Sequence, residues 1–203
     1  MSDIMNNLSY ISNVLRSIEK NEVDDFADSF SNTQYTSKQW LVNTLSQQTK
    51  YFKKQPRVLV LGSWYGSYLV PMLKETIDPK LITLTDKSLR SVEIAASLHR
   101  ESKDICEFVC LDVEKHEQRL RSFDADIVIN TSCEHMHDMS NLKLSNSKCL
   151  YIFQSCDNKN DPGHINTSRS VEEFEMKSGL SEVIFKGTYK YPNKNRFMIM
   201  GFK

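Results

Sequence analysis

The feature that most constrains the fold of this chain is a change of pattern at Pro56. From there on, short apolar runs of strand length alternate with segments whose apolar residues recur at helical spacing. Such alternation predicts a parallel sheet covered by helices on both faces. Strands are expected at 57–61, 81–85, 107–111, 126–130, 148–154, 182–189 and 196–202, and helices at 67–76, 89–100 and 171–178.

The last two strand-like runs are joined by the short turn Pro192-Asn193-Lys194-Asn195. This turn is too short for a crossover helix, so these two strands must pair antiparallel. The prediction is an open, mostly parallel seven-stranded α/β sheet with an antiparallel last strand. Ligands of such sheets bind beyond the carboxyl ends of the strands, at the point where the strand order reverses.

The segment before Pro56 has a different character, because it contains helical spacing and no strand-like run. Three helices are expected in it, the third capped by Thr36 or Ser37 and presenting Trp40 and Leu41 on one face. Residues 1–49 are therefore predicted as an N-terminal helical cap, and residues 50–203 as the α/β domain.

Charge and composition exclude several classes of protein. Lys and Arg number 26 and Asp and Glu number 26, so bulk charge does not indicate a nucleic-acid partner, although one is possible. No apolar run approaches the roughly 20 residues of a membrane helix, and the first residues lack the pattern of a signal peptide. The five scattered cysteines predict reduced thiols and a cytoplasmic location.

Three successive strand ends carry residues suited to one ligand. The first strand runs into Gly62-Ser63-Trp64-Tyr65-Gly66, where glycines permit a tight turn at the start of a helix. The second strand ends at Asp86, whose carboxylate suits two ribose hydroxyls, and the third at Asp112, placed to meet an adenine edge. Their order along the chain favours an adenosine-bearing cofactor.

With these motifs the chain resembles the class I S-adenosylmethionine-dependent methyltransferases, from about Pro56 to Lys203. The resemblance rests on the stretches 58–66, 85–86, 111–112 and 126–136. It implies a Rossmann-like fold, S-adenosyl-L-methionine as cofactor and methyltransferase activity. The cofactor-binding residues that it implies are Gly62, Ser63, Trp64, Tyr65, Gly66, Asp86, Lys87, Asp112, Val113 and Asn130.

Two positions depart from the family pattern. The family usually has an acid where Val60 stands and a glycine where Trp64 stands. Another residue must then meet the methionine amino group of the cofactor. The Trp64 ring is expected either to face the sulfonium, a cation–π contact worth about 0.5–2 kcal/mol, or to pack against the N-terminal helices.

The segment after the fourth strand is dense in polar groups and is the expected catalytic region. Methyl transfer is an in-line displacement, and a base assists only when the acceptor has a proton to lose. Glu134 and His135 are the first candidates for acid–base and substrate-orienting roles, and a second polar cluster after the fifth strand adds His164. Cys133, Asn166 and Lys190 are the residues expected to bind the substrate.

The acceptor is predicted to be a small molecule or a nucleotide-type compound. Asn130-Thr131-Ser132-Cys133 lacks the prolines that amino-methylating and cytosine-methylating DNA enzymes of this fold carry there. The histidines show no helical i, i+4 pair, and no metal is predicted. Basic residues of the last hairpin, Lys190, Lys194 and Arg196, are compatible with an anionic substrate or with a solvated face.

Two other functions remain open at this stage. The altered first motif is compatible with a non-catalytic module that acts as a subunit of a complex. A nicotinamide-dependent oxidoreductase ranks lower, because the chain lacks a complete Gly-x-Gly-x-x-Gly and a Tyr-x-x-x-Lys pair. The sequence does not reveal the atom that is methylated or the oligomeric state.

Overall fold

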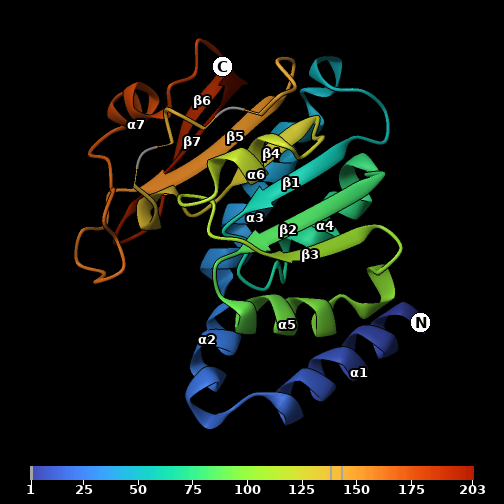
Figure 1. Cartoon of the computed structure of the whole chain (residues 1–203). Helices are drawn as coiled ribbons and strands as arrows, with labels where there is room; N and C mark the ends of the chain where they lie inside the picture. Colours follow the sequence, from blue (N-terminus) through green and yellow to red (C-terminus); the bar gives the residue numbers. More distant parts are fainter. Residues whose placement is uncertain (1, 138, 143) are drawn as a thin grey trace.

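The computed structural model describes residues 2–137, 139–142 and 144–203, and its strands form one seven-stranded sheet (Figure 1). The strand order is β3-β2-β1-β4-β5-β7-β6. β1 to β5 run parallel, and β7 runs antiparallel to both β5 and β6. This confirms the predicted Rossmann-like fold. The strands are β1 (Arg57–Leu61), β2 (Leu81–Asp86), β3 (Cys106–Cys110), β4 (Ile127–Asn130), β5 (Leu150–Cys156), β6 (Glu182–Lys190) and β7 (Asn195–Phe202).

Helices cover both faces of the sheet, because alternate residues of its strands point in opposite directions. Val58 and Val60 of β1 pack with the helices α3 and α4 on one face. Leu59 and Leu61 pack with α6 and α7 on the other face. The helices are α1 (Ser2–Ser17), α2 (Val23–Asp28), α3 (Asn32–Ser46), α4 (Leu69–Ile77), α5 (Leu89–Leu98), α6 (Glu117–Arg121) and α7 (Val171–Ser178).

Helix α3 belongs to the core of the sheet, although it lies in the N-terminal segment. Its residues Leu41, Val42 and Leu45 are buried in the same apolar cluster as β1. The prediction that Thr36 or Ser37 is the N-cap residue of this helix was wrong. The helix begins at Asn32, and its N-cap is Ser31, whose hydroxyl accepts from the Gln34 N–H. Ser37 instead lies inside the helix.

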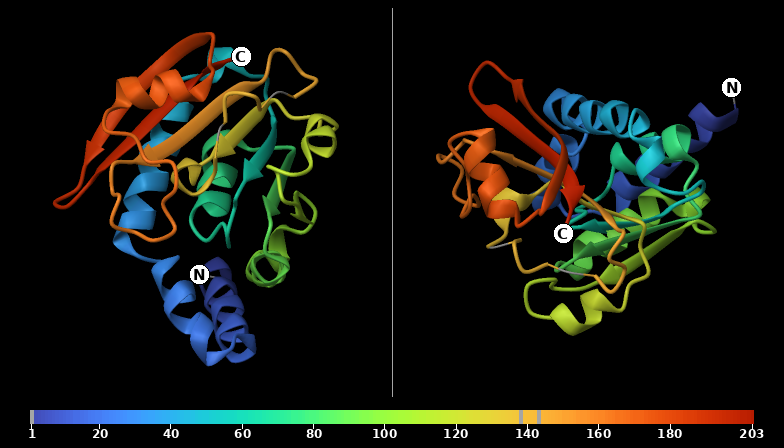
Figure 2. Two further views of the ribbon diagram at one scale, coloured as in Figure 1. Left: turned by 60° about the vertical axis from the view of Figure 1, so that its left-hand side comes forward. Right: turned by 90° about the horizontal axis from the view of Figure 1, so that it is seen from above.

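Helices α1 and α2 project beyond the rest of the chain, and α1 lies along α5 (Figures 1 and 2). Arg90 of α5 donates two hydrogen bonds to the Glu22 carboxylate, from Nε to Oε1 at 2.7 Å and from Nη2 to Oε2 at 2.9 Å. The hydrogen bonds from Arg90 lower the pKa of Glu22 to about 2. In the part of the chain that the structure describes, no helix is both long enough and apolar enough to span a bilayer.

Candidate functional site

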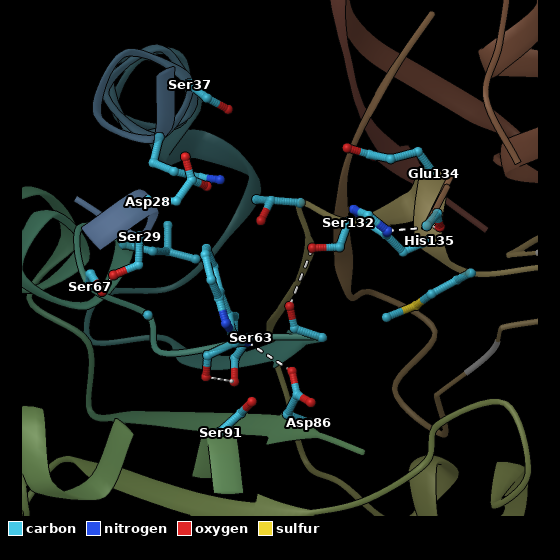
Figure 3. Close-up of a pocket in the computed structure, with 18 of the residues that line it drawn as sticks. Asp28, Ser29, Ser37, Ser63, Ser67, Asp86, Ser91, Ser132, Glu134 and His135 are labelled. Carbon is cyan, nitrogen blue, oxygen red and sulfur yellow. Dashed lines mark hydrogen bonds between the residues drawn. The ribbon is translucent and has the colours of Figure 1, made fainter. Parts of the chain in front are cut away.

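A cavity of about 610 Å³ opens beyond the carboxyl ends of the parallel strands (Figure 3). It lies where β1 is flanked by β2 on one side and β4 on the other, which is the switch point of the sheet. In Figure 3, Asp86 lies at one end, and Glu134 and His135 of the 3₁₀ turn η4 (Cys133–His135) lie at the other. Asp28, Ser29 and Ser37 of the N-terminal helices form a third side.

The turn after β1 has an unusual backbone, because three of its residues have positive φ. Gly62, Trp64 and Gly66 have φ of 57°, 50° and 64°. At Gly66 an added Cβ would lie 2.8 Å from Leu84 Cδ2, so both conformation and space require glycine. Trp64 tolerates the conformation because its backbone N–H donates to Asp86 Oδ2 at 2.9 Å. The turn is therefore fixed by the end of β2.

The Trp64 ring packs toward the N-terminal helices, one of the two arrangements expected from the sequence. It stacks on Tyr65 with ring centroids 4.8 Å apart, beside an apolar cluster that contains Val14 and Phe26. Tyr65 is buried in that cluster and does not line the cavity, whereas Trp64 does. The Trp64 indole therefore contacts the apolar cluster of helices α1 and α2 and is also part of the cavity wall.

The two carboxylates at the ends of β2 and β3 both line the cavity, together with Lys87 and Val113. Asp86 Oδ1 accepts from the Ser88 N–H at 2.9 Å, so each of its oxygens holds one backbone N–H and keeps further lone pairs. Burial of Asp112 is outweighed by hydrogen bonds from Lys115 and the backbone, which lower the pKa of Asp112. Both groups can accept hydrogen bonds from a ligand.

A buried histidine supports the turn from behind. His99 Nε2 donates to the Tyr65 carbonyl at 2.9 Å, and its side chain stacks near Phe108. Burial lowers the pKa of His99 to about 4. The folded turn therefore contains His99 with a neutral ring near neutral pH.

We expect acid to destabilise the protein through His99. An unfolded histidine takes up its proton at about pH 6.5, whereas the folded one does so at about pH 4, so stability falls as the pH drops through this window. The full loss is on the order of 3 kcal/mol. Urea denaturation of the wild type and of His99→Gln at several pH values measures it. An equally steep loss in the variant would contradict this assignment.

The far end of the cavity holds a buried ion pair. Arg196 Nη1 of β7 donates to Glu134 Oε1, and Nη2 donates to the Thr131 carbonyl. The two side chains are only 10% and 5% exposed. Glu134 Oε2 and Arg196 Nε have no hydrogen-bond partner among the described residues. Glu134 lines the cavity, but its Oε2 atom is itself buried in the wall, where an unpartnered oxygen costs stability.

Two histidines lie side by side near this pair, with ring centroids 4.6 Å apart. His135 Nδ1 donates to the Gly163 carbonyl at 2.9 Å, and His164 Nδ1 donates to the Asn158 carbonyl at 2.6 Å. Because carbonyls only accept, each Nδ1 atom carries a proton, and in the neutral form of such a ring the Nε2 atom is an acceptor. Both side chains line the cavity.

The structure places five of the sequence-predicted site residues outside the cavity lining. Asn130 is buried and donates to Met136 Sδ at 3.1 Å, which organises the loop after β4. Cys133 is buried, and burial raises the pKa of its thiol. Asn166 turns away from His164 and donates to the His137 carbonyl. The remaining two are Tyr65 and Lys190.

Two lining residues of α3, Lys38 and Gln34, were not singled out by the sequence interpretation. Lys194 and Arg196 of the last hairpin, which the sequence made compatible with an anionic substrate, line the cavity as well. Burial and the nearby Arg196 lower the pKa of Lys38 to about 7. No local signal marks Lys38, because only the packing of α3 on the sheet brings it to the strand ends.

Glu134, Cys156 and His164 each offer one metal-ligand atom, all within 4.8 Å of one another. The Arg196 guanidinium that holds Glu134 would repel a cation there. The His164 Nδ1 proton is also engaged by the Asn158 carbonyl. Cys156 Sγ lies 3.6 Å from His164 Nδ1, whereas Glu134 pairs with Arg196, and the absence of a catalytic metal stays a prediction.

Comparison with known proteins finds no matching family model and no matching curated sequence. Solved structures match the fold, which is that of the class I S-adenosylmethionine-dependent methyltransferases. One is TrmK of M. capricolum with S-adenosyl-homocysteine, with 13% identity, TM-score 0.54, and coverage of 80% of this chain and 67% of that chain. Another is an O-methyltransferase family protein of Burkholderia thailandensis, with 14% identity, TM-score 0.55, and coverage of 98% and 69%.

A third similar structure is a variant of MtNAS in complex with S-adenosylmethionine. It is 9% identical, has a TM-score of 0.56, and the match covers 97% of this chain and 72% of that one. At these identities the likeness concerns the fold. Structures of this fold have thus been solved with the methyl donor and with its product bound.

Proposed function

We propose that this protein is an S-adenosylmethionine-dependent methyltransferase that acts on a small-molecule or nucleotide-type acceptor. The observation that carries the proposal is the shared cavity, whose one end is formed by the β1 turn, Asp86 and Asp112 and whose other end holds Glu134 and His135. Its volume of about 610 Å³ lies within the range of small-ligand sites.

The cofactor occupies the end formed by β1, β2 and β3 in this proposal. Asp86 accepts from the ribose hydroxyls, and Asp112 with Val113 contacts the adenine. The carbonyls and N–H groups of the 62–66 turn face the methionine part. Val60 is buried in the core and offers no acceptor, so the methionine ammonium takes its partner from the other polar groups of the cavity.

The acceptor occupies the opposite end, under the N-terminal helices that complete its pocket. Glu134 and the Nε2 atoms of His135 and His164 accept its hydrogen bonds, and Lys194 suits an anionic part of it. These contacts hold the acceptor in line with the methyl group, and such positioning supplies much of the acceleration of a displacement reaction. The free cysteines suit a reducing, cytoplasmic setting.

Thermal unfolding with S-adenosylmethionine, S-adenosylhomocysteine or NAD tests the proposal. A ligand at about 100 times its dissociation constant adds roughly 2.7 kcal/mol of stability, so the two adenosyl ligands should raise the melting temperature. Stabilisation by NAD alone would favour an oxidoreductase. No response to any of the three would favour a non-catalytic module of a complex.

Transfer of a labelled methyl group from S-adenosylmethionine, first to a pool of small molecules and nucleotides and then to RNA, identifies the acceptor class. We expect His135→Ala to keep cofactor binding and to reduce transfer, because its side chain lies at the acceptor end. Loss of cofactor binding in this variant with an intact fold would contradict the role given to His135.

A further inference from the structure

The wall that α3 contributes to the cavity holds an amine whose position is well fixed. Lys38 is half-buried, and its Nζ donates to Gln34 Oε1 at 2.6 Å, one helical turn earlier. Helix α3 is anchored at the neighbouring position, because Ser37 Oγ donates to Gln154 Oε1 of β5 at 2.9 Å. The amine is thus held beside the carboxyl ends of the strands, in the cavity that Glu134 and Arg196 also line.

The surroundings of this amine favour its neutral form. Burial, followed by the charge of Arg196, lowers the pKa of Lys38 to about 7, while Glu134 and Asp28 act in the opposite sense. Near neutral pH a large share of the amine is unprotonated and carries one lone pair. The charged or titratable groups facing the same region are Asp28 of α2, Glu134 and His135 of η4, Asp161 and His164 of the next loop, and Lys194 and Arg196 of the last hairpin.

Among the other candidate bases in the cavity, Glu134 is already committed to an ion pair. Arg196 already occupies Oε1 of Glu134, so that carboxylate is neutralised within an ion pair. His135 and His164 each donate from Nδ1 to a backbone carbonyl, and in the neutral form their Nε2 atoms can accept. The Lys38 amine donates one hydrogen bond, to Gln34, and this leaves its lone pair available in the neutral form.

We infer that Lys38 takes the proton from the acceptor during methyl transfer, an inference that rests on the proposed function. The acceptor atom forms a bond to the methyl carbon, and the carbon–sulfur bond breaks with its electron pair going to sulfur, which yields S-adenosylhomocysteine. The proton on the acceptor atom moves to Lys38 Nζ, which then releases it to water. The substrate class is therefore a compound that reacts through a hydroxyl or an N–H group.

An acceptor-free measurement tests whether Lys38 lies at the reacting centre. The donor carries a sulfonium cation that the product lacks, and apart from this charge the two differ only by the methyl group on sulfur. Protonation of Lys38 between about pH 8 and pH 6 should therefore weaken binding of S-adenosylmethionine relative to S-adenosylhomocysteine. We expect the ratio of the two dissociation constants, measured by calorimetry on the full chain, to rise about tenfold on acidification.

Variants assign this change to Lys38. In Lys38→Met the ratio should be independent of pH, and in Lys38→Arg it should stay high throughout, because the guanidinium keeps its charge. His135→Gln and His164→Gln should behave like the wild type. A pH-dependent ratio that survives in Lys38→Met, or that disappears in a histidine variant, would overturn the inference. Failure of both ligands to bind the wild type would instead contradict the proposed function.

Turnover separates proton transfer from simple proximity. On the compound that the wild type methylates, the rate should rise with pH through about 7, as Lys38 loses its proton. We expect Lys38→Arg and Lys38→Met each to lower this rate about a hundredfold or more while S-adenosylhomocysteine binding is kept. Full activity of Lys38→Arg would show that the residue only supplies charge and would overturn its role as the base.

Discussion

Replacing Arg196 with methionine should destabilise the fold by about 3–5 kcal/mol, because it leaves the Glu134 carboxylate buried without its partner. The two side chains are 10% and 5% exposed, so water compensates little of the loss. The Thr131 carbonyl also loses its donor. Urea denaturation at neutral pH measures the change. A milder loss in acid, where the carboxyl is protonated, would support this cause.

Two controls separate the buried charge from the lost side chain. The double variant Glu134→Gln with Arg196→Met should lose less stability than Arg196→Met alone, because no unpaired charge remains. Arg121→Met breaks the ion pair between Arg121 and Glu117, whose side chains are 54% and 53% exposed, respectively. Because this pair is exposed, its loss should change stability little. A loss in Arg196→Met no larger than in Arg121→Met would mean that water reaches Glu134 in solution.

The sheet was predictable because its signal is local. Apolar runs such as Val58-Leu59-Val60-Leu61 read directly as strands, and a short turn between the last two runs permits only antiparallel pairing. The cavity end formed by the β1 turn, Asp86 and Asp112 followed from the same pattern, because parallel strands end at one edge of the sheet.

The opposite end of the cavity was less predictable, because it depends on which distant segments pack together. Lys38 reaches the cavity only because Leu41 and Leu45 bury α3 against the sheet. Arg196 meets Glu134 only because β7 inserts beside β5. His164 and Asn166, expected to point the same way in an extended segment, diverge because the loop there is turned. Pairings between remote segments leave no trace in a single sequence.

Asp86 carries the second large expectation, which concerns cofactor affinity. Asp86→Asn should raise the dissociation constant of S-adenosylhomocysteine about tenfold or more, equivalent to about 1.4 kcal/mol. An amide has one acceptor oxygen, so it cannot hold the N–H groups of both Trp64 and Ser88 as the carboxylate does. The Trp64 backbone, with φ of 50°, then loses the bond that keeps it in place.

Two further variants serve as controls for Asp86→Asn. Asp112→Asn should weaken binding less, because the hydrogen bonds of Asp112 run to Lys115 and Glu114 within its own turn. Asp104→Asn, an exposed acid outside the cavity lining, should leave affinity unchanged. Calorimetric titration with S-adenosylhomocysteine measures all three. If Asp86→Asn keeps wild-type affinity while its fold is intact, the carboxylate only shapes the turn and the ribose must bind elsewhere. Weaker binding by Asp86→Asn with an unchanged melting temperature would assign the loss to the ribose contact, whereas weaker binding with a lower melting temperature would assign it to the turn.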